Sequence, residues 1–555
     1  MAGEMKKYWK RDYAATGLAT ILGIAGCVKP LVPGLHAGES RRVRDALFEQ
    51  NQVLHIEIEI PEPGIERLRQ YRWQWNSEEA QERPKVKVVV REGTETFKDV
   101  SLHLKGAAGS FRSIDDKPAM TLNFDRHVRG QKFHGLDKLS LNNSVQDPTL
   151  CNERLARQLF LEAGVPVPRA THARVTLNGR SLGLYVLVEG YNRRFLRGHF
   201  EDDSGNLYDG GFVRDIEGPM AVNSGELPED QSDVEGLNEA LQLSNLVERE
   251  ERLRELLDLD RFLNHLALDV ILVNWDGYHL NRNNFRVFSD RSRAKLVFMP
   301  HGLDQLLENP EGPIFPNYQG RVTQAVMAIP AMQEAYFERL QILVNDLFDV
   351  PRIHERIDGI AEVIRRDLML NDPSAISKYL DRVGSLKDKV VQRYEILQRQ
   401  LDGPSKVPEF DPAGTVRLTE WAPDRFFGKP KLETGEHEGH QALTLTTEEG
   451  TSVGRWQTSV WLEAGDYELA GLVKIDGVEA GRGDPRGGVA LWTSVRRIRE
   501  RQTGSQDWAT QQVKFTVRQP FQEVQLFCEY RATQGTAWVD AQSLQLKRSP
   551  TASRP

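Results

Sequence analysis

The spacing of apolar residues changes twice along this 555-residue chain, and this change limits the fold more than any other feature. Between residues 53 and 189, short runs such as VLHIEIEI (Val53–Ile60) alternate apolar and polar residues, as half-buried strands do. Between residues 237 and 401, apolar residues recur at three- and four-residue spacing, which is typical of amphipathic helices. After residue 415 the two-residue alternation returns. The sequence therefore predicts an α+β domain, with a sheet-rich lobe before a helical lobe, and then an all-β domain.

Within this pattern, one helix and two irregular stretches are expected. A helical pattern at Thr149–Ala163 follows Asp147-Pro148, so we expect a mixed sheet with one helix lodged in it. Residues 201–233 are rich in Asp, Glu, Gly and Ser and predict a solvated insertion. The prolines of Leu401–Thr415 predict a linker, which we place at residues 403–415. The later helices are expected at Leu237–Leu257, Leu259–Asn274, Met332–Phe348, Arg352–Met369 and Ala375–Leu401.

The first residues have the layout of an export signal. Residues 1–27 combine basic residues with a short apolar run, Ala14–Ala25, which is too short for a comfortable transmembrane helix. Ile24–Cys27 also resembles the bacterial lipobox, in which Cys27 becomes the lipidated first residue of the mature protein. A plain signal peptide and an uncleaved membrane anchor fit the same residues. All three interpretations place the chain outside the cytoplasm, in the cell envelope, with residues 28–50 as a spacer.

Charge and cysteine content limit the partners. The chain has 72 basic and 80 acidic residues and no basic stripe with interleaved aromatics, so nucleic acid is not expected as a partner. Beyond the signal only Cys151 and Cys528 remain, in different predicted domains. They are expected to be buried thiols rather than a disulfide.

Polar residues in the middle of the chain carry the candidate chemistry. VNWDGYHLNRNNFRVF (Val273–Phe288) places Asp276 and Asn284 in a polar loop, and KLVFMPHGLDQLL places Asp304 just after a short strand. Magnesium prefers hard oxygen ligands, and one carboxylate can orient an attacking hydroxyl, so this set suits phosphoryl transfer. Asp and Asn are also common turn residues, and two carboxylates are equally the requirement of a glycosidase.

Four stretches resemble the spore-coat-protein-H (CotH) family of atypical kinases, in the order in which that family has them. The resemblance implies a bilobal, protein-kinase-like domain over residues 51–402. It also implies phosphorylation of Ser or Thr on exported or surface proteins, with ATP and Mg²⁺ or Mn²⁺ as cofactors. The stretches are Gly130–Ala170, the hairpin THARVTLNGRSLGLYVLVEGYNRRF (Thr171–Phe195), Asp258–Phe288 and the less specific Leu386–Leu401.

The same resemblance implies roles for single residues. Asp276 corresponds to the residue that orients or deprotonates the acceptor hydroxyl, and Asn284 and Asp304 to the metal ligands. In KGAAGSFRSIDDKPAMTLNF, lysines are expected to contact the phosphates, with a helical glutamate as their ion-pair partner. These residues are Lys105, Lys117 and Glu153; ordinary surface positions would explain them as well.

The match departs from the family at one place. Where many members have Trp-Asp-x-Asp, this chain has His301-Gly302-Leu303-Asp304, so that Gly302 replaces the first carboxylate. This substitution leaves open a degenerate kinase fold that serves as a non-catalytic envelope scaffold.

Residues 416–547 predict a β-sandwich. Its ending, GTAWVDAQSLQL (Gly535–Leu546), resembles jelly-roll carbohydrate-binding modules, which implies a glycan partner. Tryptophan rings stack on sugar faces, although several of these rings are expected in the core. The tryptophans are Trp456, Trp461, Trp492, Trp508 and Trp538.

Overall fold

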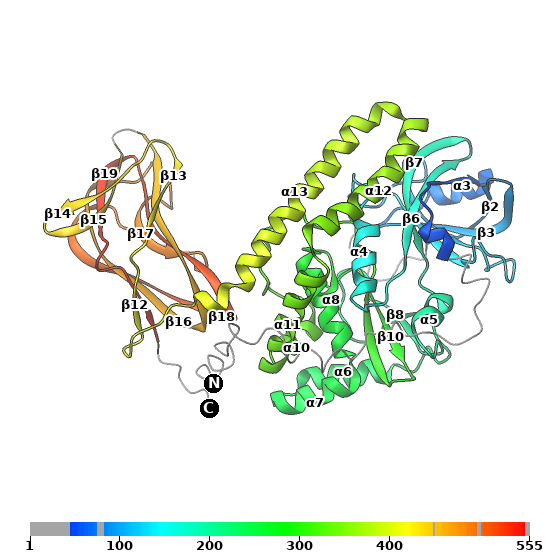
Figure 1. Ribbon diagram of the computed structural model, residues 1–555, viewed down its shortest axis with the longest axis horizontal. Coiled ribbons are helices and arrows are strands. Elements are labelled where there is room, and N and C mark those ends of the chain that lie inside the picture. The colour runs from blue at the N-terminus through cyan, green and yellow to red at the C-terminus, as the bar shows by residue number, and fades with distance from the viewer. Residues whose placement is uncertain (1–44, 75–82, 448–449, 497–500, 550–555) are drawn as a thin grey trace. The chain divides into compact units, whose positions relative to one another are not determined.

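The computed structural model describes residues 45–74, 83–447, 450–496 and 501–549 (Figure 1). The chain forms two compact units that divide between Leu397 and Gln398. The first is mixed α+β and the second is sheet-rich, so the expected fold class is confirmed at this level. The predicted signal and Cys27 lie outside the described residues. None of the helices among the described residues is long and apolar enough to span a membrane.

The first unit begins with a closed barrel, where the sequence predicted a mixed sheet. Neighbouring strands are antiparallel except β1 and β6, which pair in parallel and close the barrel. The alternation in β1 buries Ile56 and Ile58 inside the barrel and leaves Glu57 and Glu59 exposed. Such alternation is identical in an open sheet, so it could not predict closure. The barrel order is β1 (Leu54–Glu59), β2 (Val86–Glu92), β3 (Glu95–Lys105), β4 (Ala119–Asn123), β5 (Lys138–Asn142), β7 (Arg180–Glu189) and β6 (Ala170–Leu177).

One buried helix, α4 (Asn152–Glu162), connects β5 to β6 and occupies most of the segment predicted as helix. Its charged residues Glu153, Arg154 and Arg157 are buried together with its apolar ones. Buried charges need partners or a function, so α4 attracts attention before any site is considered. A shorter helix, α3 (Glu62–Arg69), follows β1.

A small sheet and a set of helices complete the first unit. The sheet has the order β11-β10-β8-β9, and two of its strands lie in residues 201–233, which were predicted to be an insertion without regular structure. These strands are too short to show a period in the sequence, but Leu207 and Tyr208 in β8 are fully buried. The strands are β8 (Leu207–Asp209), β9 (Ala221–Ser224), β10 (Phe285–Asp290) and β11 (Lys295–Pro300).

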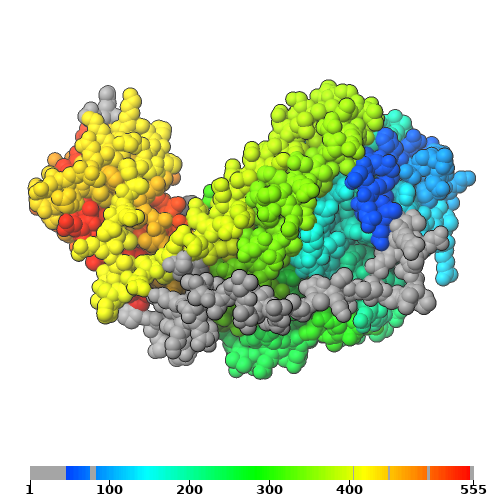
Figure 2. Space-filling view, in the orientation of Figure 1, coloured from blue at the N-terminus to red at the C-terminus, as the bar shows by residue number. Residues whose placement is uncertain are grey.

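The predicted helix Leu237–Leu257 is two helices, because Asn245 caps a new helix by accepting a hydrogen bond from the Val247 amide at 3.0 Å. Figure 2 shows the yellow-green surface of α12 and α13 beside the cyan and blue surface of the barrel side of the unit. The helices are α5 (Arg193–His199), α6 (Ser232–Gln242), α7 (Leu246–Leu256), α8 (Leu259–Ile271), α9 (Tyr278–Asn281), α10 (Arg321–Met327), α11 (Pro330–Asp346), α12 (Val350–Asn371), η1 (Pro373–Ala375) and α13 (Ile376–Leu401).

The second unit is built around two long strands that pair with each other along most of their length, β16 (Ser452–Glu479) and β18 (Gly504–Ala532). A bulge between Glu463 and Gly465 interrupts the register. Apolar side chains form one core that contains Trp456, whereas the jelly-roll topology stays a prediction. The other elements are η2 (Gly403–Lys406), β12 (Thr415–Arg417), β13 (Ala422–Phe427), β14 (Lys431–His437), β15 (His440–Thr447), β17 (Gly488–Thr493), β19 (Gln534–Asp540) and β20 (Gln545–Arg548).

Candidate active site

The loop after α8 is fixed at its start by a buried carboxylate. Asn274 donates its backbone N–H to the Asp269 carbonyl and its side-chain amide to Asp269 Oδ1, each at 2.8 Å. Behind the loop lie two buried imidazoles, with His265 Nε2 at 3.5 Å and His279 Nε2 at 3.8 Å from Asp269 Oδ2. Burial raises the pKa of Asp269 to about 8. The hydrogen bonds between Asn274 and Asp269 therefore fix the start of the polar loop that carries Asp276.

The carboxylate of Asp276 is surrounded by side-chain amides. Its Oδ1 accepts hydrogen bonds from Asn281 at 2.7 Å and Asn283 at 3.1 Å. Its Oδ2 accepts from Asn284 at 2.7 Å and from Gln305 at 3.4 Å. Side-chain amides hold both oxygens of this carboxylate in place, so Asp276 has a fixed orientation, as a catalytic carboxylate requires.

Asn284 sits between Asp276 and the segment that follows β11. Its backbone is left-handed, with a φ of 50°, and its carbonyl accepts from the His301 N–H at 2.7 Å. Its side-chain Nδ2 donates a hydrogen bond to Asp276 Oδ2, so the Asn284 Oδ1 faces Gly302. A Cβ atom on Gly302 would lie 2.6 Å from that oxygen. The glycine that departs from the family pattern thus leaves the space that the Asn284 amide fills.

Helix α4 holds the segment that carries Asp304. Asn152 donates to the Asp304 carbonyl at 2.8 Å, and Arg157 donates to the His301 carbonyl. The pKa of the Asp304 side chain is raised, first by burial and then by the negative charge of the neighbouring Glu153. A cation beside Asp304 would relieve this repulsion.

Lys105 reaches Glu153 through an asparagine. Its ammonium donates to Asn142 Oδ1 at 2.7 Å, and the Asn142 amide donates to Glu153 Oε1 at 2.8 Å. Glu153 in turn pairs with Arg157 at 2.6 Å, with 2% of each side chain exposed. Burial lowers the pKa of Lys105 to about 8, against the opposing attraction of Glu153. The expected lysine–glutamate pair is therefore bridged rather than direct.

Lys117 lies apart from this chain of contacts. Its ammonium is 5.1 Å from the centre of the Tyr185 ring, and burial lowers its pKa to about 8. In the described part of the chain, its side chain has no recorded hydrogen bond or ion pair with Asp276, Asn284 or Asp304. Of the two lysines predicted at the phosphates, Lys105 is the one that hydrogen bonds connect to Glu153 through Asn142.

Three contributors were not singled out from the sequence: Asn142, Arg157 and Gln305. Arg157 lies four residues after Glu153 in a predicted helix, and this spacing alone indicates a salt bridge. Asn142 ends a strand and Gln305 follows Asp304, and nothing in their local sequence distinguishes them from ordinary polar residues.

The donor set fits the cofactors that the sequence implied. Asn284 Oδ1 and the Asp304 carboxylate are hard oxygen ligands of the kind that Mg²⁺ and Mn²⁺ bind. Lys105 carries a compact positive charge on a flexible stem, which suits contact with a phosphate.

Comparisons with known proteins identify the family of the chain. The family model described as CotH kinase protein matches residues 102–399, which confirms the family resemblance. Spore coat protein homolog 1 of Rhizopus delemar is 21% identical over 268 residues, covering 43% of this chain and 43% of that protein. The inner spore coat protein H of Bacillus subtilis is 21% identical over 261 residues, covering 43% of this chain and 71% of that protein. The chain thus spans less than half the length of the Rhizopus relative.

Among solved structures, the proinflammatory kinase CtkA of Helicobacter pylori is 11% identical. The matched region covers 54% of this chain and 96% of the CtkA chain, with a TM-score of 0.26.

Proposed function

The chain belongs to the CotH kinase protein family, and from this premise we propose that its first unit is a protein kinase. The reaction transfers the γ-phosphoryl group of ATP to a Ser or Thr hydroxyl of an exported or surface protein. The observation that carries the proposal is the contact between Asp276 and Asn284, which leaves the Asn284 oxygen beside the Asp304 segment.

Each residue has one task in this reaction. Asp276 orients the acceptor hydroxyl and takes its proton as the new oxygen–phosphorus bond forms and the bond to ADP breaks. Asn284 and Asp304 would hold Mg²⁺ or Mn²⁺, which would neutralise charge on the phosphates. Lys105 contacts the phosphates, and Asn142 fixes its ammonium at 2.7 Å.

The test uses the full chain with ATP and Mg²⁺ or Mn²⁺. Phosphate incorporation into the protein itself and into Ser/Thr peptides is measured for the wild type and for Asp304→Asn. Loss of at least a hundredfold is expected for Asp304→Asn, because a metal ligand is removed. Asp358→Asn, which changes a 59% exposed aspartate far from these contacts, is the matched control and keeps the transfer.

A folded wild type that binds no nucleotide would contradict the kinase. That result would favour the alternative, a non-catalytic scaffold of the cell surface with a degenerate kinase-like body. The amide contacts of Asp276 and the bridged Lys105 have no role in a glycosidase, so we place that third reading last.

A second function, glycan binding, is supported by an aromatic cluster in the C-terminal unit. The cluster consists of His437, His440, Trp508 and Trp538. His437 stacks on Trp538 with ring centroids 4.1 Å apart, and His440 lies 4.3 Å from Trp508.

Polar groups surround these rings, as sugar recognition requires. Glu438 accepts from the Trp508 indole N–H at 3.1 Å and pairs with Lys474 at 2.8 Å. Half-buried rings beside charged hydrogen-bonding groups suit a sugar, which has an apolar face and a rim of hydroxyls. Trp456, by contrast, is a core residue.

Affinity electrophoresis of the full chain in soluble xylan, galactan and β-glucan tests this function. We expect retardation that is lost in Trp508→Ala and Trp538→Ala. Trp492→Ala, which removes a ring stacked on Phe527 outside the cluster, keeps it. Equal migration of all variants in every polysaccharide would contradict glycan binding.

For location, we propose the cell envelope. The names of the two relatives refer to the spore coat and support a location outside the cytoplasm. The lipobox-like Cys27 supports a lipid anchor to the membrane.

A further inference from the structure

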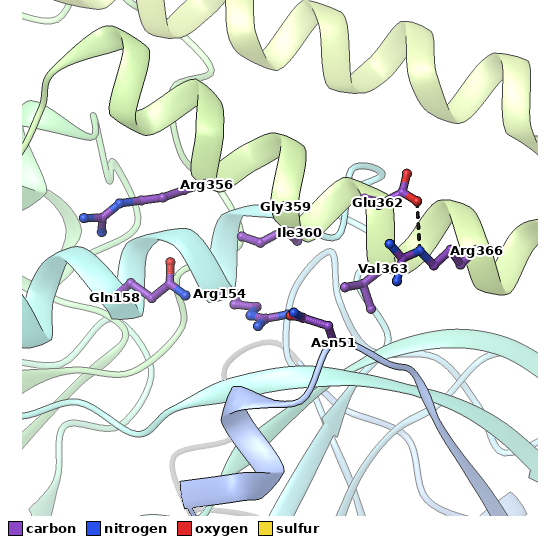
Figure 3. Close-up of a pocket in the computed structure, with 9 residues that line it drawn as sticks. All are labelled: Asn51, Arg154, Gln158, Arg356, Gly359, Ile360, Glu362, Val363 and Arg366. Atoms are coloured by element: carbon purple, nitrogen blue, oxygen red, sulfur yellow. Dashed lines mark hydrogen bonds and ion pairs between the residues drawn. The ribbon is translucent and has the colours of Figure 1, made fainter.

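A cavity of about 350 Å³ lies between α4 and α12, on a different set of residues from the candidate active site (Figure 3). Arg154 and Gln158 of α4 line one wall, and Arg356, Gly359 and Arg366 of α12 line the other. Figure 3 shows side chains from both helices directed into the space between them.

One arginine of this cavity has a nitrogen without a partner among the described residues. Arg154 is 8% exposed, and its Nη1 is buried without a hydrogen-bond partner among the described residues. Arg356, in contrast, donates to both carboxylate oxygens of Glu162 at 2.8 Å, and Arg366 donates to Glu362 at 2.8 Å. An unpaired buried charge costs several kcal/mol, so its presence in a folded protein calls for a counter-ion.

We propose that this α4–α12 cavity binds a phosphate-bearing small molecule, with the phosphate paired to Arg154. A guanidinium matches the geometry of phosphate oxygens through parallel N–H donors. The Gln158 amide adds a neutral donor, and the cavity is about ten times the ~30 Å³ that one water takes up in the liquid. The space therefore suits a phosphate monoester better than a bare ion.

The cavity is also coupled to the candidate active site through α4. Arg154 follows Glu153 directly, and Glu153 and Arg157 make the contacts to Asn142 and to the His301 carbonyl. A phosphate that fixes Arg154 stabilises α4 in the position from which it holds the Asp304 segment. The binding of the ligand is independent of the proposed kinase activity, whereas its regulatory effect rests on that activity.

Binding is tested on the full chain without ATP or Mg²⁺, by calorimetry and thermal unfolding with inorganic phosphate and pyrophosphate. Sodium chloride at the same ionic strength is the reference. We expect saturable binding that Arg154→Leu weakens at least tenfold. Without ligand, Arg154→Leu unfolds at a higher temperature than the wild type, because a buried unpaired charge is removed. The charge-matched control, Arg252→Gln on the exposed side of α7, keeps the affinity.

A second variant blocks the cavity without touching the arginine. Gly359 lines the cavity, and a Cβ on it meets no atom within 4 Å, so a side chain can start there. Gly359→Leu adds bulk at the cavity wall and removes a helix-weakening glycine. We expect Gly359→Leu to lose phosphate binding while staying folded, and the smaller Gly359→Ala to retain most of it.

Three results would overturn the proposal. One is a folded wild type whose unfolding temperature responds equally to phosphate and chloride. Another is equal weakening in Arg154→Leu and Arg252→Gln. The third is binding that survives in Arg154→Leu and disappears in Lys105→Gln, which would put the phosphate in the nucleotide site. If the chain transfers no phosphate but still binds phosphate in an Arg154-dependent way, only the proposed kinase function is wrong.

Discussion

At the scale of single residues, the contact between Asn284 and Gly302 determines how the site departs from its family. The Asn284 oxygen lies where a side chain at position 302 would begin. The missing carboxylate is therefore matched by a local rearrangement in which an amide oxygen takes the space. The site thus lacks the first carboxylate of the family pattern but keeps an oxygen atom, Asn284 Oδ1, beside position 302.

This contact predicts that restoring the family residue does harm. Gly302→Asp places a Cβ 2.6 Å from Asn284 Oδ1 and pushes the amide away from Asp276. We expect a loss of about 1–3 kcal/mol of unfolding free energy from overpacking, and a fall in phosphate transfer rather than a gain. Urea unfolding and the transfer assay measure both.

Gly302→Ala is the matched control, because it adds the same Cβ without the charge. If Gly302→Asp were as stable as the wild type and more active, the steric argument would be wrong.

Some of these residues were accessible from the sequence and others were not. Asp276 and Asn284 lie within one short loop, so their meeting could be predicted from spacing and from the family pattern. The sequence favoured Lys117 over Lys105 at the phosphates, whereas the hydrogen bonds connect Lys105 to the other residues; which lysine faces them depends on the closure of the barrel, which the sequence did not predict. The fit of Gly302 against Asn284 is a contact across a hairpin, and glycine carries no side chain that would indicate it.

At the scale of elements, α4 connects the barrel to the segment of Asp304. Its buried pair, Glu153 with Arg157, is the centre of these connections. A buried charge pair that loses one partner leaves an uncompensated charge.

We therefore expect Glu153→Ala to cost about 3–5 kcal/mol of unfolding free energy. Glu162→Ala on the same helix removes a more exposed pair with Arg356, with side chains 41% and 20% exposed. That variant should cost less than about 1 kcal/mol. Urea unfolding followed by circular dichroism compares the two, and similar losses would contradict the special place of Glu153.

Asp269, which fixes the start of the loop that carries Asp276, predicts that stability depends on pH. Burial raises the pKa of Asp269 from its ordinary 3.8 to about 8, so the folded protein holds this proton to a higher pH than the unfolded chain does. Unfolding releases the proton between these values, and the free energy of unfolding contributed by Asp269 falls as pH rises through this range.

Asp269→Asn removes this titration and keeps an oxygen that can accept from Asn274. Relative to the variant, the wild type should lose stability between pH 5 and pH 8, by up to about 1.4 kcal/mol per pH unit. Asp358→Asn, at an exposed carboxylate, should follow the wild type. Parallel pH curves for wild type and Asp269→Asn would show that Asp269 is ionised in the folded state.

Long helices were predictable and closed sheets were not. The three- and four-residue spacing located α8, α11, α12 and α13 within a few residues. The barrel and the short strands of residues 201–233 depend on pairing between distant segments, which periodicity does not encode.

At the scale of the whole molecule, the chain divides into two compact units. In the proposed function, the first unit carries the chemistry and the second carries recognition of a glycan. Retention at the membrane would then depend on the N-terminal residues.

The proposed lipid anchor at Cys27 can be tested by fractionation of bacteria that produce the full chain. We expect the wild type in the membrane fraction and Cys27→Ser in the soluble envelope fraction, because the lipidated thiol is removed. Cys151→Ser, which alters a buried thiol, is the control and stays in the membrane fraction. Membrane retention of Cys27→Ser would favour an uncleaved anchor.

The parallel pairing that closes the barrel also sets a time order on folding. The first strand pairs with β2 on one side, but on its other side Leu54 pairs with Ala173, so the barrel closes only after more than a hundred further residues. Pairing between segments so far apart is slow, because the intervening chain must first be ordered. The barrel of an emerging chain therefore stays open over this interval, and under the proposed envelope location an open barrel would favour passage of the unfolded chain across a membrane.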